Sequence, residues 1–279
     1  MLLRQPVAHG RFYPGRPDDL ARETSEYLAA CAPAEKDSRK PWAVMLPHAG
    51  YIFCGNIIGK TLAGTELAPR LVVLCPNHTG RGQVLGVWPS GAWLDPCGTV
   101  AVDENLAAQL IRSGGGFTAD TNSHLLEHSI EVILPFLQAA EGAKLRGIVP
   151  VTVGTQNPQF LQHAGKALAR VLALPENADA GVVVSSDMNH YESEKRTLEK
   201  DNMALESALA ADPDTLLETV AREEISMCGA GPLALALYAG QALGKLDVDL
   251  VAHDTSARAS GDTEHTVGYA GLRLYLDRI

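Results

Sequence analysis

The sequence has no apolar run long enough to cross a bilayer, and aromatic residues make up only 5% of its 279 residues. A transmembrane helix needs about 20 consecutive apolar residues. The N-terminal letters MLLRQP also lack the apolar core of a secretory signal. We therefore expect a cytoplasmic protein that does not contact a membrane.

Cysteine is scarce, and basic residues do not dominate the charge. The five cysteines are an odd number, which makes a disulfide framework a poor interpretation and predicts free thiols. Acidic residues outnumber basic ones by 33 to 23, so the formal net charge is −10. Because no basic stripe is visible, we expect no nucleic-acid partner.

The composition is that of a globular protein, and apolar strands alternate with helical patterns along most of the chain. Hydrophobic residues make up 46% of the sequence and charged residues 20%. This alternation predicts a single α/β domain over residues 1–279, a sandwich with a central, largely parallel or mixed sheet flanked by helices. We predict helices over 17–32, 55–63, 103–113 (capped by Asp103), 127–140, 159–172, 193–211, 214–222 and 228–243, and strands over 42–46, 71–75, 84–88, 145–153, 182–184, 246–253 and 267–276, with a charged connector over 33–41.

Three of the predicted strands run directly into polar segments that contain histidine. These are SSDMNH with His190, PHAGY with His48, and PNHTG with His78. Ligands of open α/β sheets sit beyond the carboxyl ends of the strands, so the three imidazoles are expected at one rim. Neutral imidazole is the commonest metal ligand, and we predict that His48 and His78 share a metal ion. The alternative is a histidine that is only hydrogen-bonded in a loop, which is the commoner role of a lone histidine.

Cys228 is the third candidate ligand. It precedes an apolar helical stretch, where the positive end of the helix dipole lowers a thiol pKa and favours the thiolate that binds metals. The alternative is a cysteine that only packs against the sheet.

Asp187 and His190 lie three residues apart, just beyond a strand. A carboxylate beside an imidazole orients it for proton transfer near neutral pH, so we predict that Asp187 orients His190 as an acid/base catalyst. The alternative is that Asp187 caps the helix that follows.

The segment from His124 to His128 matches the H-x-x-E-H pattern of zinc peptidases. On a helix, both histidines would share a face and Glu127 would activate water. The pattern is short, and this interpretation leaves the strand-end histidines without a role. Glu131 lies one turn further on, where it would either hydrogen-bond into the pocket or remain a solvated surface charge.

Taken together, the motifs resemble the Memo family, whose bacterial members are called AmmeMemoRadiSam system protein B. The resemblance runs nearly end to end and rests on GRFYPG at 10–15, PHAGY at 47–51, PNHTG at 76–80, EHSIE at 127–131, LPFL at 134–137, SSDMNH at 185–190, CG at 228–229 with Pro232, and VGYA at 267–270. It implies the fold of the class III (LigB-like) extradiol dioxygenases, which are non-haem iron enzymes.

The resemblance also implies a set of site residues. It implies metal ligation by His48, His78 and Cys228, and a pocket with His128, Asp187 and His190 as catalytic residues. We assign substrate contacts to the neighbouring Tyr51, Asn77 and Glu131. In the ring-cleaving relatives a carboxylate occupies the position of Cys228, and a thiolate shifts the preference toward softer ions such as Cu(I) and Zn(II).

Three hypotheses follow. The first is a Memo-like protein with one metal ion, Fe(II) as the expected ion and Cu or Zn as alternatives, that performs redox or dioxygenase-like chemistry on a small molecule. The second is a non-catalytic metal-binding or scaffold protein that docks a peptide or partner, with Tyr51, Trp88 and Trp93 as an apolar wall. The third is the zinc peptidase. The sequence does not fix the substrate or the oligomeric state.

Overall fold

The computed structural model describes residues 2–31, 39–141 and 144–278. Within these residues, nine strands form one mixed sheet in the order β10-β12-β2-β9-β3-β8-β4-β7, with β11 paired to β12. The strands are β2 (Ala43–Leu46), β3 (Arg70–Pro76), β4 (Leu85–Val87), β7 (Phe117–Ala119), β8 (Gly147–Val153), β9 (Ala180–Ser185), β10 (His190–Glu192), β11 (Gly244–Thr255) and β12 (Thr266–Arg278).

The centre of the sheet is parallel and its flanks are mixed. Strands β2, β9, β3 and β8 run parallel, whereas β12 pairs antiparallel with β2, β10 and β11, and β4 pairs antiparallel with β8. Because β2, β9 and β3 are parallel neighbours, their carboxyl ends meet at one edge, where the polar segments begin.

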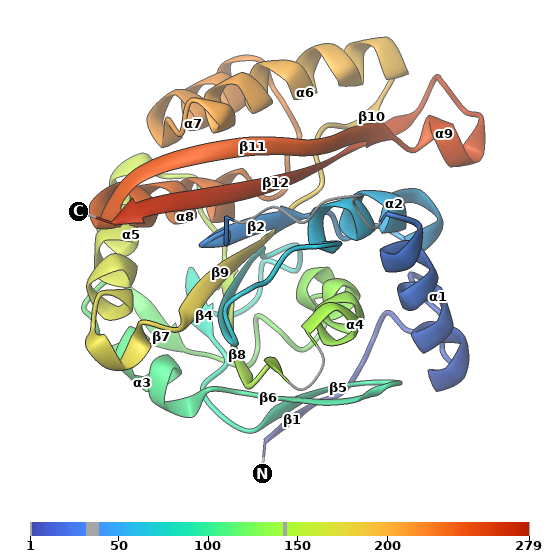
Figure 1. The fold of residues 1–279 in the computed structure, drawn as a ribbon. Helices are drawn as coiled ribbons and strands as arrows, with labels where there is room; N and C mark the ends of the chain where they lie inside the picture. The colour runs from blue at the N-terminus through green and yellow to red at the C-terminus, as the bar shows by residue number, and fades with distance from the viewer. Residues whose placement is uncertain (1, 32–38, 142–143, 279) are drawn as a thin grey trace.

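Helices cover both faces of this sheet (Figure 1). The helices are α1 (Pro17–Ala30), α2 (Tyr51–Leu62), α3 (Glu104–Arg112), α4 (Ser129–Glu141), α5 (Pro158–Leu172), α6 (Glu194–Leu209), α7 (Pro213–Arg222), α8 (Ala230–Leu243) and the short α9 (Ala257–Ser260). The predicted α/β class with a mixed, helix-flanked sheet is confirmed. No helix in the described ranges is long and apolar enough to span a membrane.

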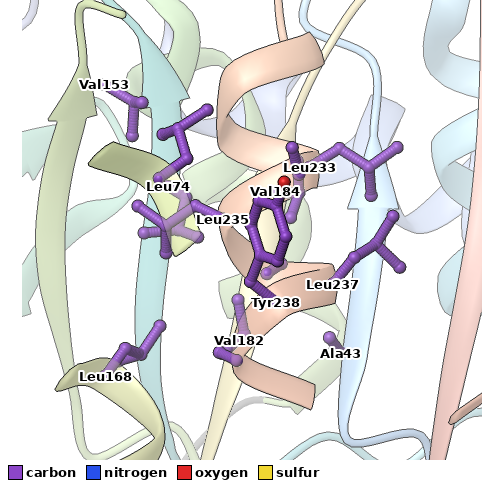
Figure 2. Packing of buried hydrophobic residues seen from close by; sticks show 14 of the residues in the cluster. Ala43, Leu74, Val153, Leu168, Val182, Val184, Leu233, Leu235, Leu237 and Tyr238 are labelled. Carbon is purple, nitrogen blue, oxygen red and sulfur yellow. The ribbon is translucent and has the colours of Figure 1, made fainter. Parts of the chain in front are cut away.

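Alternate side chains of each central strand enter two different hydrophobic clusters. In β3, Val72 and Leu74 pack with α3, α5 and α8, while Leu71 and Val73 pack with α1, α2 and α4. Successive residues of a strand point to opposite faces, so a strand buried on both faces reads as a continuous apolar run. Figure 2 shows the first cluster, in which Leu235 and Tyr238 of α8 lie near Leu74 and Val182 of the sheet.

Local sequence signals placed most helix ends correctly. The predicted cap Asp103 accepts a hydrogen bond from the Leu106 amide at 3.0 Å, and Ser193 caps α6 in the same way. A side-chain acceptor at the N-cap satisfies an amide that has no partner within the helix. The predicted elements otherwise agree with the structure to within a few residues, and residues 33–38 of the expected connector lie outside the described ones.

A second, three-stranded sheet was not predicted. It has the order β1-β5-β6 and consists of β1 (Leu3–Arg4), β5 (Ala92–Asp95) and β6 (Gly98–Ala101). In Figure 1 it lies below α4, and its strand β6 contacts β8 of the large sheet. Strands this short, one of them only two residues long, carry too little periodicity to be recognised in the sequence.

Candidate metal centre

His48, His78 and Cys228 converge at the carboxyl edge of the parallel strands. His48 follows β2, His78 follows β3, and Cys228 lies two residues before α8. One ligand atom from each of the three lies within 4.8 Å of the others, and Nε2 of His48 is 3.4 Å from Sγ of Cys228. The structure thus brings together the three residues predicted as ligands, in a geometry that one ion can bridge.

Hydrogen bonds fix the orientation and tautomer of His48. Its Nδ1 lies 2.8 Å from Oγ of Ser185, and that hydroxyl donates its own proton to the Ser129 carbonyl at 2.8 Å. The hydroxyl therefore accepts from His48, so the ring proton sits on Nδ1 and the Nε2 lone pair faces Cys228. Burial, and then the neighbouring His128 and His78, lower the His48 pKa well below its usual value. The ring is neutral, as a ligand must be.

Glu127 orients His78. Its carboxylate accepts from the His78 backbone amide at 2.7 Å and lies 2.9 Å from Nδ1 of the same residue. Burial alone would raise the pKa of Glu127, but the hydrogen bonds from His78 and Ser129 lower it to about 2. The carboxylate accepts the hydrogen bond from the Nδ1 proton of His78. Nε2 of His78 is therefore left to bind a metal ion. The sequence does not reveal this role, because nothing local links Glu127 to a residue 49 positions earlier.

A second group of potential donors overlaps the first. His78, Glu127 and His128 also have ligand atoms within 4.8 Å of one another. The Glu127 oxygens, however, already accept hydrogen bonds from His78 and Ser129. We therefore interpret Glu127 as the carboxylate that holds His78 and not as a separate ligand.

The environment of Cys228 differs from the prediction. Its pKa is raised well above the usual value, first by burial and then by the nearby Asp187 carboxyl, whereas we expected the helix dipole to lower it. The reason is that α8 begins only at Ala230, so the thiol is half-buried near a carboxyl instead of lying in the first helical turn. A bound cation reverses this balance, since it stabilises the thiolate directly.

Asp187 and His190 do not form the pair that we predicted. The Asp187 carboxylate accepts from the His48 backbone amide at 2.7 Å, and His190 Nδ1 lies 2.9 Å from the Ser226 carbonyl. A carbonyl only accepts, so Nδ1 of His190 carries the proton and Nε2 is the basic nitrogen. Ser226, two residues before Cys228, is the residue that orients His190. The alternative role of Asp187 as a helix cap is also wrong, because Ser193 caps α6.

His128 completes a cluster of three imidazoles. Its ring is stacked with that of His78 at 5.1 Å between centroids and meets the ring of His48 edge-on at 5.5 Å. Phe12 covers it, with the ring centroids 4.7 Å apart. Burial lowers the His128 pKa, so the ring is neutral at pH 7. The structure thus places His128 where a molecule beside the two predicted histidine ligands would meet it.

Of the three residues assigned to substrate contact, Asn77 lines a cavity together with two of the predicted metal ligands. A cavity of about 300 Å³ is lined by Asn77, His78 and Cys228 together with Thr155 and Gln156. A cavity of this size is suited to a small ligand.

Tyr51 and Glu131 are buried and bonded within the protein, which corrects their assignment as substrate contacts. The Tyr51 side chain is 1% exposed, and its hydroxyl donates to the Val132 carbonyl. Glu131 is fully buried, forms an ion pair with Arg4 and accepts from the Tyr13 hydroxyl at 2.6 Å. Glu131 is therefore neither a substrate contact nor a solvated surface charge. Its partners lie in the N-terminal segment, more than 100 residues away in the sequence, where no local pattern reveals them.

The peptidase interpretation and the proposed apolar wall are also corrected. His124 is fully buried, with Nε2 2.9 Å from the Gly86 carbonyl, and it is absent from both groups of potential ligands among the described residues. The motif lies in turns before α4 and not on a helix, so its two histidines share no face. Trp88 and Trp93 are buried around His124, and they offer no surface to a partner.

Comparison with known proteins supports the family resemblance that the motifs indicate. The family model described as Memo-like protein matches residues 4–273. A MEMO1 family protein of Thermotoga neapolitana is 38% identical over 288 residues, which cover 98% of this chain and 100% of the relative. A MEMO1 family protein of Sulfurisphaera tokodaii is 34% identical over 284 residues, covering 98% and 99% of the two chains. The chain belongs to the Memo-like family.

Proposed function

We propose that this protein holds one metal ion through Nε2 of His48, Nε2 of His78 and Sγ of Cys228. The observation that carries the proposal is the convergence of these three donors from separate segments, with both imidazoles orientated by hydrogen bonds through Nδ1. Such outer partners fix the tautomer and raise the basicity of a metal-bound histidine. The donor set fits a borderline or soft divalent ion, and Fe(II) is the ion that we test first, followed by Cu and Zn.

The proposed activity is redox chemistry of the non-haem kind on a small molecule. The ion would supply an electrophilic centre with open positions. His190 has its basic Nε2 available because Nδ1 donates to Ser226, so it moves a proton to or from the bound molecule. Asp187 holds the loop that carries His48 through the backbone amide of that residue. The relation to class III extradiol dioxygenases, the correspondence to AmmeMemoRadiSam system protein B and a cytoplasmic location belong to the same proposal.

The metal content of protein purified without an affinity tag tests the site. We expect about one equivalent in the wild type and loss of the ion in His48→Ala and in Cys228→Ala, because two donors bind far more weakly than three. His163→Ala is the matched control, since His163 is exposed on α5 and bonded to the Gly114 carbonyl. Unchanged metal content in both site variants would refute the proposal.

A second candidate is a metal carrier without turnover. The His78 side chain is 36% exposed, so an ion bound there is accessible to an acceptor molecule. Oxygen consumption with a panel of catechols and thiols under reducing conditions separates the two functions. Consumption that is lost in His190→Ala supports the enzyme, whereas tight metal binding without consumption supports the carrier.

A further inference from the structure

Tyr191, which directly follows His190, has a strained backbone. Its φ of 61° lies in the left-handed region, which is uncommon for any residue with a side chain and an outlier for a bulky one. The register of β10 against β12 also shifts here, since His190 pairs with Val267 and Glu192 pairs with Thr266. Tyr191 is therefore the extra residue of a β-bulge. Bulges beside active sites change the direction of a side chain.

The bulge directs an aromatic ring into solvent beside the candidate centre. The Tyr191 side chain is 76% exposed, and its ring centroid is 5.7 Å from that of His190. An exposed ring buries little apolar surface, so the packing of the Tyr191 ring does not offset the strain of its backbone. A glycine would adopt this φ without steric cost. Neither folding nor local packing explains a tyrosine at this position.

Tyr191 is electrostatically coupled to the buried Tyr269. The pKa of Tyr269 is raised by its burial and, to a smaller degree, by the charges of Asp187, Cys54 and Tyr191. Both the Asp187 carboxyl and the Tyr191 hydroxyl are thus within electrostatic range of one phenol. The position of the Tyr191 ring follows from its contact with the ring of His190, the neighbouring residue in the chain.

We propose that Tyr191 is a ligand-contacting residue, whose ring packs on the apolar portion of a small molecule that binds with its polar head beside His190. This inference rests on the proposed function, because the polar head is the part that the metal centre would bind. It adds the class of ligand, which is a molecule with a polar chelating group and an adjoining apolar group. A side chain held at this angle before the ligand arrives costs little entropy on binding.

Two chelators that differ only in their apolar group provide the test. Acetohydroxamate and benzohydroxamate are titrated calorimetrically into Fe(II)-loaded protein without oxygen. We expect the wild type to bind benzohydroxamate more tightly by about 3- to 10-fold, as is typical of a ring contact. Tyr191→Gly should bring this ratio close to one without changing acetohydroxamate binding, and Tyr191→Phe should preserve the ratio.

Thermal stability provides a readout that does not depend on the ligand. Tyr191→Gly removes the strain, so we expect its Tm to be equal to or about 1–3 °C above that of the wild type. Ala211→Gly is the matched control, because Ala211 has a φ of 52° between α6 and α7 and should gain stability without any change in the ligand ratio.

Each possible result of these measurements either supports or overturns the proposed role of Tyr191. A ratio that survives in Tyr191→Gly would show that the ring does not contact the ligand and would overturn the inference. A clear fall in the Tm of this variant would show that the ring has a packing role and would also overturn it. If the wild type binds neither hydroxamate, the metal proposal fails and this inference fails with it. Normal acetohydroxamate binding combined with an unaltered ratio refutes the role of Tyr191 alone.

Discussion

Nε2 of His48 lies 3.4 Å from Sγ of Cys228, although 180 residues separate the two in the chain. The contact exists because β2 and β9 are parallel neighbours and α8 returns over the same sheet. His48 leaves the carboxyl end of β2, and Cys228 precedes α8. Ser185, the last residue of β9, then holds the His48 ring, and Asp187, two residues beyond, holds the His48 backbone amide. Five expected outcomes test this edge of the sheet and the buried residues around it.

Glu127→Gln should weaken metal binding about 10- to 100-fold, as is typical when the partner of a metal-bound histidine is replaced. The amide can donate to Nδ1 of His78, which would move the ring proton to Nε2 and block the nitrogen that faces the ion. Chelator competition measures the affinity. Glu176→Gln, a change at an exposed glutamate far from the site, is the control and should leave the affinity unaltered.

Cys228→Asp should shift the metal preference from Cu(I) and Zn(II) toward Fe(II), because a carboxylate is a harder ligand than a thiolate. The measurement is the ratio of ions bound when the apo-protein is exposed to equimolar mixtures without oxygen. Cys97→Asp is the matched control, since Cys97 is an exposed free thiol. An identical ratio in the wild type and in Cys228→Asp would show that Cys228 does not bind the ion.

Arg4→Met should destabilise the fold by about 3–5 kcal/mol, because it leaves the buried carboxylate of Glu131 without its counter-charge. Urea unfolding of the metal-free protein measures the free energy of unfolding. Arg22→Met removes a pair with Asp19 whose side chains are both exposed, and it should cost no more than about 0.5 kcal/mol. Equal effects of the two substitutions would mean that the buried pair contributes no more than a surface pair.

His124→Gln should make the protein less sensitive to acid. Burial lowers the pKa of His124 from 6.5 to about 4. The unfolded chain therefore binds a proton before the folded one does, and stability falls as the pH drops from 6.5 toward 4. Over this range the loss due to His124 is about 3 kcal/mol. The free energy of unfolding of the variant should accordingly decrease less between pH 7 and pH 4.

The same variant separates the peptidase hypothesis from the proposed centre. His124 bonds to the Gly86 carbonyl and lies outside the ligand cluster, so the metal content of His124→Gln should equal that of the wild type. Loss of the ion in this variant would restore the peptidase motif as the metal site.

The predictions from sequence were most accurate where the signal was local. Asp103 at a helix start and the apolar run before SSDMNH depend only on neighbouring residues, and both the helix and the strand are present. Ligand sites of α/β sheets lie beyond the carboxyl ends of the parallel strands, and this rule predicted that His48 and His78 lie at one edge, as they do. The orientation of His190 was predicted wrongly, because the Ser226 carbonyl that holds it belongs to a segment 36 residues away.

The sequence by itself determined the α/β class, most of the elements and the residue types at the strand ends, since periodicity and caps act over a few residues. The tertiary structure alone decided which groups meet: Glu127 with His78, Ser185 with His48, and Arg4 with Glu131. Buried polar groups must find partners wherever the fold places them, and those partners come from distant segments. The identity of the donors is therefore a property of the sequence, whereas their orientation and protonation are properties of the fold.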